Sequence, residues 1–213
     1  MMNYIFDLDG TLLDSMGVWD QVDIDFLRDH GLTQPDGYTD ALNKMNLVDS
    51  AKYTIELFNL NYTPESLIEL WQRMAMHAYA NEVELKPHAL EFLHALKQRG
   101  AKIGIATSLR PNLHTLPLSR HGITDLFDAI AHSGEVNVSK GNPDVFLLAA
   151  ARMGAQPSDC IVFEDILPAI QSAKSAGMLT CAVYDESAKK DWAEMKKIAD
   201  YAITDFRDAP FVM

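Results

Sequence analysis

The chain has 213 residues, a formal net charge of −12, and 48% hydrophobic residues. This length and apolar content suit one large domain, or a core domain with a smaller insert. The acidic balance makes nucleic acids and anionic membranes poor partners. No apolar run reaches the length of about 18 residues that a membrane-spanning helix needs.

Two further features bear on the compartment. The first residues lack the basic-then-apolar layout of a signal peptide, so we expect a cytoplasmic protein. Cys160 and Cys181 both lie in apolar segments, which favours buried thiols over a disulfide or a metal pair.

The first predicted element is a short buried strand over residues 3–8 (NYIFDL), which ends at Gly10. From about residue 16 to 82, apolar residues recur at helical spacing and no strand alternation is visible. Within this block Thr63 precedes Pro64, the pattern of a helix N-cap with proline in the first turn. We therefore predict an all-helical segment after the first strand.

From Pro87 onward, helical patterns alternate with short apolar strands. Helices are predicted at 88–99, 112–120, 142–153, 167–176 and about 187–198, strands at 101–107, 160–165, 179–184 and 199–203, and an apolar patch at 127–131. Such alternation predicts a parallel sheet with helices on both faces.

The fold class that follows is α/β, a doubly wound parallel sheet with an inserted all-α domain. We place the core in residues 1–15 and 83–213, and the helical insert in residues 16–82. Open α/β sheets bind ligands at the carboxyl ends of their strands. Because the insert follows the first strand at that end, we expect it to act as a lid.

Two acidic pairs end predicted strands. Asp7 and Asp9 alternate with Leu8, so they point the same way in a strand, and Glu164 with Asp165 ends the segment CIVF. One aspartate pair alone would also fit turn or helix capping. Four carboxylates at neighbouring strand ends would repel each other strongly without a cation. Hard oxygen ligands in this number favour Mg²⁺.

Four other residues fit an anionic ligand. Thr107 and Ser108 end the strand KIGIA, where hydroxyls and backbone amides can hold phosphate oxygens. Lys140 precedes a predicted helix, where its ammonium group can neutralise both a phosphate group and an anionic nucleophile. Arg110 lies just after the turn that carries Thr107 and Ser108. Taken singly, each also has a structural interpretation, as a helix cap or a solvated surface side chain.

Together these residues resemble the haloacid dehalogenase superfamily of phosphotransferases. The chain is most similar to its branch with a helical cap after the first strand, which contains β-phosphoglucomutase and many sugar-phosphate phosphatases. The resemblance runs from FDLDGTLLDS to ADYAITDF. Its most specific motif is Asp-x-Asp-Gly-Thr after an apolar strand. The acidic pair followed by a helix and Ala-Gly-Met is also strong in this order and spacing.

The resemblance implies that Asp7 is the nucleophile, forming an aspartyl-phosphate. It implies that Asp9 protonates the leaving alcohol and then activates water, while its backbone carbonyl binds Mg²⁺. Dehalogenases of this superfamily lack an acid at the position of Asp9, so its presence favours phosphate esters as substrates.

The remaining roles also follow from the resemblance. Thr107 and Ser108 would hold the phosphoryl group, and Lys140 would bridge the nucleophile and the phosphate. The Mg²⁺ ligands would be Asp7, Asp9, Asp165 and Glu164, the last directly or through water. Arg110 is a candidate substrate contact.

The leading hypothesis is a Mg²⁺-dependent phosphatase acting on a small phosphorylated metabolite, a sugar phosphate or nucleotide-like compound, as a monomer or weak homodimer. An intramolecular phosphomutase is the alternative; eleven acids against four bases in residues 16–82 speak mildly against its doubly phosphorylated intermediate. A non-catalytic binding protein is a third possibility. It is suggested by Ile166 after the acidic pair and Gly141 after the lysine, which depart from the usual small residue and proline.

Overall fold

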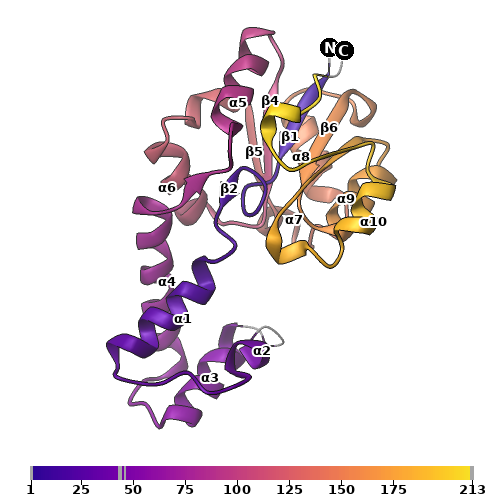
Figure 1. The fold of residues 1–213 in the computed structure, drawn as a ribbon. Coiled ribbons are helices and arrows are strands. Elements are labelled where there is room, and N and C mark those ends of the chain that lie inside the picture. The colour runs from indigo at the N-terminus through magenta and orange to yellow at the C-terminus, as the bar shows by residue number, and fades with distance from the viewer. Residues whose placement is uncertain (1, 43–44, 46, 212–213) are drawn as a thin grey trace. The chain divides into compact units, whose positions relative to one another are not determined.

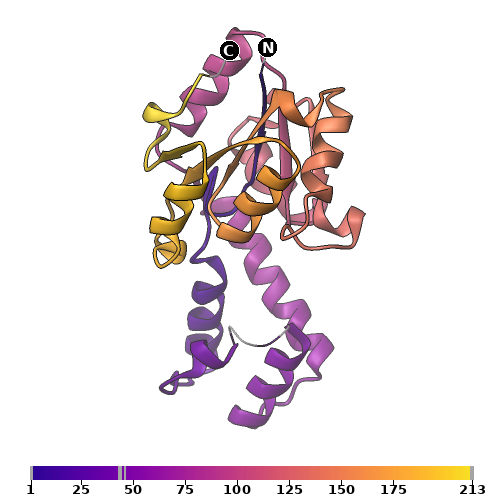
Figure 2. The same ribbon diagram turned by 90° about the vertical axis from the view of Figure 1, so that its right-hand side faces the viewer.

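The structure is a computed structural model that describes residues 2–42, 45 and 47–211. The chain divides into two compact units, residues 1–16 with 83–213 and residues 17–82 (Figures 1 and 2). The boundary that we predicted lies one residue earlier, before Met16. The two units are described in turn.

The larger unit is built on a parallel sheet of six strands in the order β5-β4-β1-β6-β7-β8. The strands are β1 (Asn3–Phe6), β4 (Ile103–Thr107), β5 (Ala129–His132), β6 (Cys160–Glu164), β7 (Leu179–Val183) and β8 (Tyr201–Ile203). The chain moves outward from β1 to β5 and then returns to β6 beside β1. The connections after β1 and β6 therefore diverge, which makes their carboxyl ends a topological switch point. The predicted doubly wound parallel sheet is confirmed.

Helices join these strands. They are α5 (Ala89–Gln98), α6 (Pro111–Arg120), α7 (Ser133–Val136), α8 (Asp144–Arg152), α9 (Leu167–Ser175) and α10 (Trp192–Ile198), with 3-10 turns at Thr124–Leu126, Pro157–Asp159, Glu186–Ala188 and Phe206–Asp208. The helix predicted from about residue 187 begins only at Trp192. The Asp185 side chain accepts a hydrogen bond from the backbone N–H of Ser187 and closes a separate turn before it.

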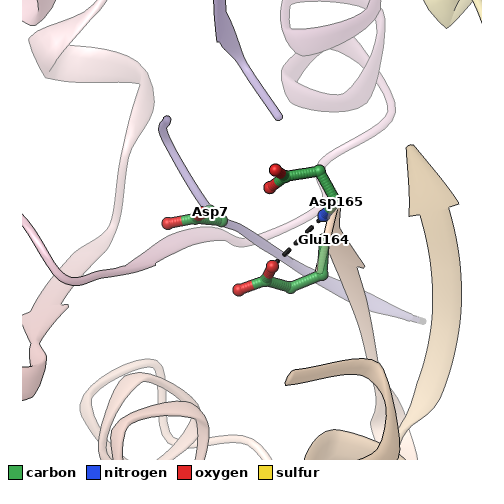
Figure 3. Close-up of side chains that lie close together, drawn as sticks. All are labelled: Asp7, Glu164 and Asp165. Carbon is green, nitrogen blue, oxygen red and sulfur yellow. Dashed lines mark hydrogen bonds between the residues drawn. The ribbon is translucent and has the colours of Figure 1, made fainter. Parts of the chain in front are cut away.

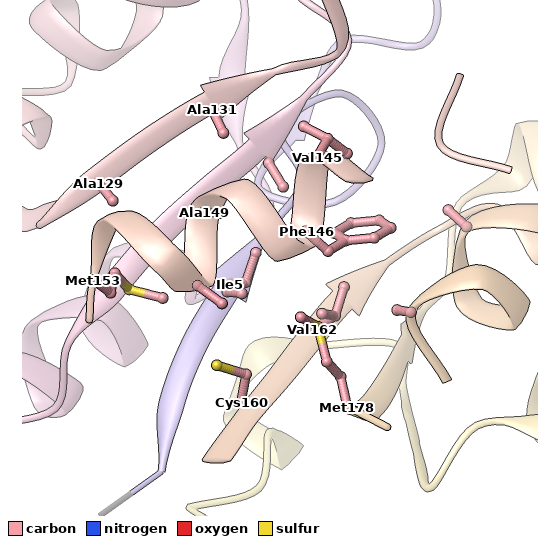
Figure 4. Close-up of a cluster of buried hydrophobic side chains, with 14 residues drawn as sticks. Ile5, Ala129, Ala131, Val145, Phe146, Ala149, Met153, Cys160, Val162 and Met178 are labelled. Carbon is pink, nitrogen blue, oxygen red and sulfur yellow. The ribbon is translucent and has the colours of Figure 1, made fainter. Parts of the chain in front are cut away.

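Side chains of β1 alternate between two different cores. Ile5 packs with Val162 of β6 and with Phe146 and Ala149 of α8 (Figure 4). The side chains of α8 in this cluster include several alanines, which lie close to the sheet. Phe6 points to the opposite face and stacks on Phe163 with ring centroids 4.7 Å apart. This alternation is the signature of a strand buried on both faces.

Two short strands frame the points where the chain leaves and re-enters this unit. β2 (Leu13–Asp14) pairs antiparallel with β3 (Glu84–Leu85). The backbone N–H of Lys86 also donates to the carbonyl of Leu12 at 2.8 Å. Neither strand was predicted, because two residues are too few to show a period.

The smaller unit contains α1 (Val18–Asp29), α2 (Tyr38–Leu42), α3 (Leu47–Phe58) and α4 (Pro64–Asn81). Both α1 and α3 pack against α4. The predicted cap of α4 is present: Thr63 Oγ1 accepts from Ser66 N at 3.2 Å, and Ser66 Oγ accepts from Thr63 N at 3.0 Å. The described residues of this unit include no strand. In the described part of the whole chain, no helix has the length and apolar character to cross a bilayer.

Candidate active site

Three carboxylates meet at the switch point of the sheet. Asp7 directly follows β1, and its backbone N–H donates to the carbonyl of Phe163 in β6 at 3.0 Å. Glu164 ends β6, and Asp165 follows it. One carboxylate oxygen from each of the three acids lies within 4.8 Å of the other two (Figure 3). The predicted convergence of two strand ends is therefore present.

Because the three carboxyl groups are buried, it costs free energy for them to be charged at the same time. The exposed fractions of Asp7, Glu164 and Asp165 are only 6%, 0% and 1%. Burial, followed by the charge of Asp7, raises the pKa of Asp165 to about 7. Burial likewise raises the pKa of Glu164 well above its ordinary value, despite the opposing effect of Lys140. The site disfavours three negative charges unless cations offset them.

Lys140 supplies one such cation. Its ammonium group forms ion pairs with Asp7 and with Glu164, the latter at 2.6 Å. Burial lowers the pKa of Lys140, but the two carboxylates outweigh this effect and raise it. At 4% exposure, Lys140 is not the solvated surface lysine that we considered from the sequence. One ammonium against three carboxylates leaves room for a further cation.

The donor set fits a hard divalent cation. Asp165 Oδ1 accepts from the Thr11 hydroxyl at 2.9 Å, while Oδ2 is buried and has no hydrogen-bond partner among the described residues. Gly10 has a φ of +74°, and a Cβ at this position would lie 2.3 Å from Asp165 Oδ2. Glycine therefore lets the backbone pass close to the carboxylates. Buried carboxylate oxygens with an unsatisfied lone pair are ligands that a hard divalent cation takes.

Asp9 occupies a different place from the one that strand alternation predicts. The strand expected over 3–8 ends at Phe6, so Asp9 lies beyond a turn and its side chain is not part of the buried cluster. The hydroxyl of Ser15 donates to Asp9 Oδ1 at 2.5 Å. The half-buried Asp9 carboxyl is thus held by the residue that directly follows β2.

The predicted phosphate-binding residues lie on the neighbouring strand β4. Thr107 is fully buried at its end, and its hydroxyl accepts from the backbone N–H of Leu109 at 3.1 Å. Ser108 is exposed, with its hydroxyl 3.5 Å from that of Ser133. Arg110 is exposed before α6 and forms no ion pair with a described residue. The structure brings Thr107 and Ser108 to this sheet edge, but it records no contact of Arg110 with the acidic cluster.

Sequence reasoning missed several supporting residues. Thr11 and Ser15 lie within FDLDGTLLDS but were assigned no role, although hydroxyl groups beside carboxylates are a recognisable signal. Ser172 of α9 donates to the carbonyl of Lys140 at 2.5 Å and fixes the lysine loop from a helix 32 residues away. No local pattern indicates this contact. A Cβ at Gly141 would make only an ordinary contact with Ser139, so sterics do not require glycine there.

These features define a carboxylate-rich α/β site, and comparison with known proteins assigns the family. The family model of haloacid dehalogenase-like hydrolases matches residues 4–183, and the chain belongs to this family. This confirms the predicted enzyme class, a haloacid dehalogenase-type hydrolase of phosphoric monoesters.

Three curated relatives illustrate the family's range. The chain is 26% identical to hexitol phosphatase B of Escherichia coli K12, covering 88% of this chain and 85% of the relative. It is 31% identical to the fructose-1-phosphate phosphatase YqaB of the same organism, covering 82% and 92%. It is 30% identical to β-phosphoglucomutase of Bacillus subtilis, covering 86% and 83%.

The fold has a close match among solved structures. A structure of a β-phosphoglucomutase-like protein from Thermotoga maritima aligns with a TM-score of 0.82 at 21% identity, covering 95% of this chain and 94% of that one. At this identity the match supports the fold alone.

Proposed function

We propose that this protein is a cytoplasmic, Mg²⁺-dependent phosphatase that hydrolyses a small phosphomonoester, a sugar phosphate or nucleotide-like metabolite. The observation that carries this proposal is the buried cluster of Asp7, Glu164 and Asp165, with Lys140 paired to Asp7 and Glu164. The names of the sugar-phosphate phosphatases among its relatives add support.

In this proposal, the carboxylate of Asp7 attacks phosphorus, and the bond between phosphorus and the leaving oxygen breaks. Asp9 gives its proton to that oxygen. Asp9 then takes a proton from a water molecule, which attacks the aspartyl-phosphate, releases phosphate and restores Asp7. Ser15 holds Asp9 for both transfers, and Lys140 keeps Asp7 paired before attack.

The metal would be held by Asp7, Asp165, Glu164 and the backbone carbonyl of Asp9. When bound, Mg²⁺ would stabilise negative charge on the phosphoryl oxygens. Thr107 and Ser108 would hold these oxygens from the other side of β1, and residues 17–82 would act as the lid.

The test is phosphate release from a panel of small phosphate esters, with Mg²⁺ and with EDTA. We expect metal-dependent release that falls by roughly 10³-fold or more in Asp7→Asn, because the amide is a poor nucleophile. Asp14→Asn is the control, since the Asp14 side chain is 72% exposed and lies outside the cluster. Folded protein that hydrolyses no ester, or Asp7→Asn with nearly full activity, would refute the mechanism.

A phosphomutase is the second candidate, favoured by the 30% identity to β-phosphoglucomutase. Both reactions use the same nucleophile, so activity loss in Asp7→Asn does not separate them. Phosphorus NMR of the product does: we expect inorganic phosphate, whereas an isomeric ester would identify a mutase.

A further inference from the structure

A pair of histidines adjoins the residues proposed to hold phosphate. His132 ends β5 and is the register partner of Thr107, which ends the neighbouring strand β4. His114 lies in α6, the helix that follows β4 (Figure 1). The imidazole rings of His114 and His132 approach each other, with their centroids 6.5 Å apart. The ends of two neighbouring strands therefore lead to one imidazole pair.

Two contacts connect this pair to the turn after β4. The hydroxyl of Ser108 lies 3.5 Å from that of Ser133, the residue that directly follows His132. The backbone N–H of His114 donates to the carbonyl of Arg110 at 3.0 Å, so the first turn of α6 carries the imidazole. Charges several ångströms apart interact more strongly in a protein than in water, because the effective dielectric constant is lower. An anion at this turn and a proton on the imidazole pair therefore influence each other.

His114 is able to change its charge near neutral pH. It is only 5% exposed, and its Nδ1 atom is buried and has no hydrogen-bond partner among the described residues. No hydrogen bond to this nitrogen therefore fixes the ring in one protonation state. Burial, followed by the charge of His132, lowers the pKa of His114. Because the ordinary value is about 6.5, the imidazole of the unliganded protein is mostly uncharged at neutral pH and is free to take up a proton.

The acid nearest to this pair is already engaged with a base. Glu135 of α7 favours the charged form of His114, and its Oε1 atom lies 3.8 Å from Nε2 of His132. Arg152 of α8, however, donates to both carboxylate oxygens of Glu135, at 3.0 and 2.5 Å. The Arg152 guanidinium therefore offsets much of the negative charge that would otherwise hold a proton on the imidazoles.

The other charged groups around α6 lie at the surface. Arg110 precedes the helix and is exposed, and Arg120 at its end pairs with Glu84. Asp125 is exposed in the 3-10 turn that packs against α6. Water and salt screen such groups. In the described part of the chain no carboxylate forms an ion pair with His114, so an incoming anion is the charge to which this imidazole responds.

A bound phosphate group supplies that charge. Negative charge beside a histidine favours the protonated ring, and linkage requires that the protonated ring favour the anion by the same factor. We propose that the binding of a phosphate anion at Thr107 and Ser108 is coupled to the uptake of one proton from solvent by His114. Phosphate ester and inorganic phosphate then both bind more tightly as the pH falls. This inference rests on the phosphate site of the proposed function.

NMR of the histidine side chains tests the coupling without any turnover. Sulfate is the probe, because it is tetrahedral like phosphate but stays fully ionised throughout the titration. In the full-length protein with MgCl₂, we expect sulfate to raise the titration midpoint of His114 by about 0.7 pH unit or more, which corresponds to a fivefold coupling. The exposed His94 of α5 is the internal reference and should not shift. NaCl at the same ionic strength controls for screening.

Variants tie the coupling to the site. Thr107→Val removes the hydroxyl with little change in shape, and we expect it to reduce the sulfate-induced shift of His114. Calorimetry measures the reciprocal effect: from pH 8 to pH 5.5, sulfate affinity should increase about fivefold more in the wild type than in His114→Gln. The carboxyl groups of Glu164 and Asp165 also titrate, but they do so in both proteins. His94→Gln is the matched control and should behave like the wild type.

Several outcomes would overturn the inference. They are a titration midpoint of His114 that sulfate leaves unchanged, an equal shift at His94, and no response of the Ser108 amide signal to sulfate. Equal pH dependence of sulfate affinity in the wild type and in His114→Gln would do the same. If no ester is hydrolysed but sulfate shifts the titration of His114, the proposed function fails and this inference stands; ester hydrolysis with an unshifted His114 gives the reverse.

Discussion

At the scale of single residues, the contact between Gly10 and Asp165 is the sharpest steric constraint of the site. Alanine at Gly10 would adopt the left-handed conformation at a cost of about 1–2 kcal/mol. It would also push against the Asp165 carboxylate. We predict that Gly10→Ala lowers the free energy of unfolding by more than this conformational cost and weakens Mg²⁺ binding, as measured by urea denaturation and calorimetry.

Gly122→Ala is the matched control for this prediction. Gly122 also has a positive φ, +65°, but no atom lies within 4 Å of an added Cβ. It should show the conformational cost alone, with Mg²⁺ binding unchanged. Equal losses of stability and of Mg²⁺ binding in the two variants would contradict the steric explanation.

At the scale of elements, the first turn of α4 depends on the reciprocal hydrogen bonds between Thr63 and Ser66. Losing an N-cap side chain costs about 0.5–2 kcal/mol. We predict that Thr63→Ala lowers the free energy of unfolding by this amount, measured by urea denaturation followed by circular dichroism. Thr63→Ser retains the hydroxyl and should stay within a few tenths of wild type; a loss as large as that of alanine would show that the cap is not responsible.

Between α6 and β5, two imidazoles approach each other in the core. Burial, then the charge of His132, lowers the pKa of His114, while Glu135 opposes the shift. A histidine with a lowered pKa binds fewer protons folded than unfolded, so its contribution to stability is complete above the ordinary value of about 6.5 and is lost as pH falls. We predict that the free energy of unfolding of the wild type falls relative to that of His114→Gln from pH 8 to pH 5.5. The raised pKa values of Asp165 and Glu164 act in the opposite direction, but they do so in both proteins.

The exposed His94 of α5 provides the comparison for this pH effect. His94→Gln should follow the wild-type dependence of stability on pH. If it changes the dependence as much as His114→Gln does, the pair of His114 and His132 is not the cause.

How far the sequence predicts each element depends on the range of the interactions that form it. Local periodicity and the glycines that end the helices predict α5, α8, α9 and the strands of the sheet other than β5. The segment of β5 is predicted only as an apolar patch over residues 127–131. The 3-10 turn before α10 depends on a single hydrogen bond from the backbone N–H of Ser187 to the Asp185 side chain. The spacing of apolar residues cannot predict such a contact. The pairing of β2 with β3 joins residues far apart in the chain, so only the folded structure reveals it.

The same limit applies to the site. That Asp7 and the acidic pair of β6 converge follows once their strands are assumed to be neighbours. That Ser172 holds the Lys140 loop, or that Ser15 binds the Asp9 carboxyl, depends on the exact path of the loops. Local motifs therefore indicate the catalytic groups better than the residues that position them.

At the scale of the whole molecule, the three buried carboxylates belong to a chain with a formal net charge of −12. A ligand that binds only the folded state stabilises it, by about 2.7 kcal/mol at 100 times its dissociation constant. We predict that MgCl₂ raises the melting temperature and EDTA removes this gain, measured by differential scanning calorimetry. Asp165→Asn should raise the melting temperature without Mg²⁺, because it removes a desolvated charge, and should abolish the gain from Mg²⁺.

NaCl at the same ionic strength controls for screening of the overall negative charge, which any salt provides. We expect NaCl to produce only a small part of the shift. A shift as large as that with MgCl₂, or a full Mg²⁺ shift in Asp165→Asn, would place the effect outside the cluster.

The pairing of β2 with β3 has a consequence for how the two units share one chain. It brings Asp14 opposite Glu84. The larger unit therefore holds the two ends of the inserted segment together by its own backbone hydrogen bonds, independently of what the inserted segment contains. For that unit, residues 17–82 amount to a long loop, and the entropy of loop closure changes by only about 0.6 kcal/mol for each doubling of loop length. Inserts of very different length can therefore be accommodated here at little thermodynamic cost, and the strand order of the sheet does not change.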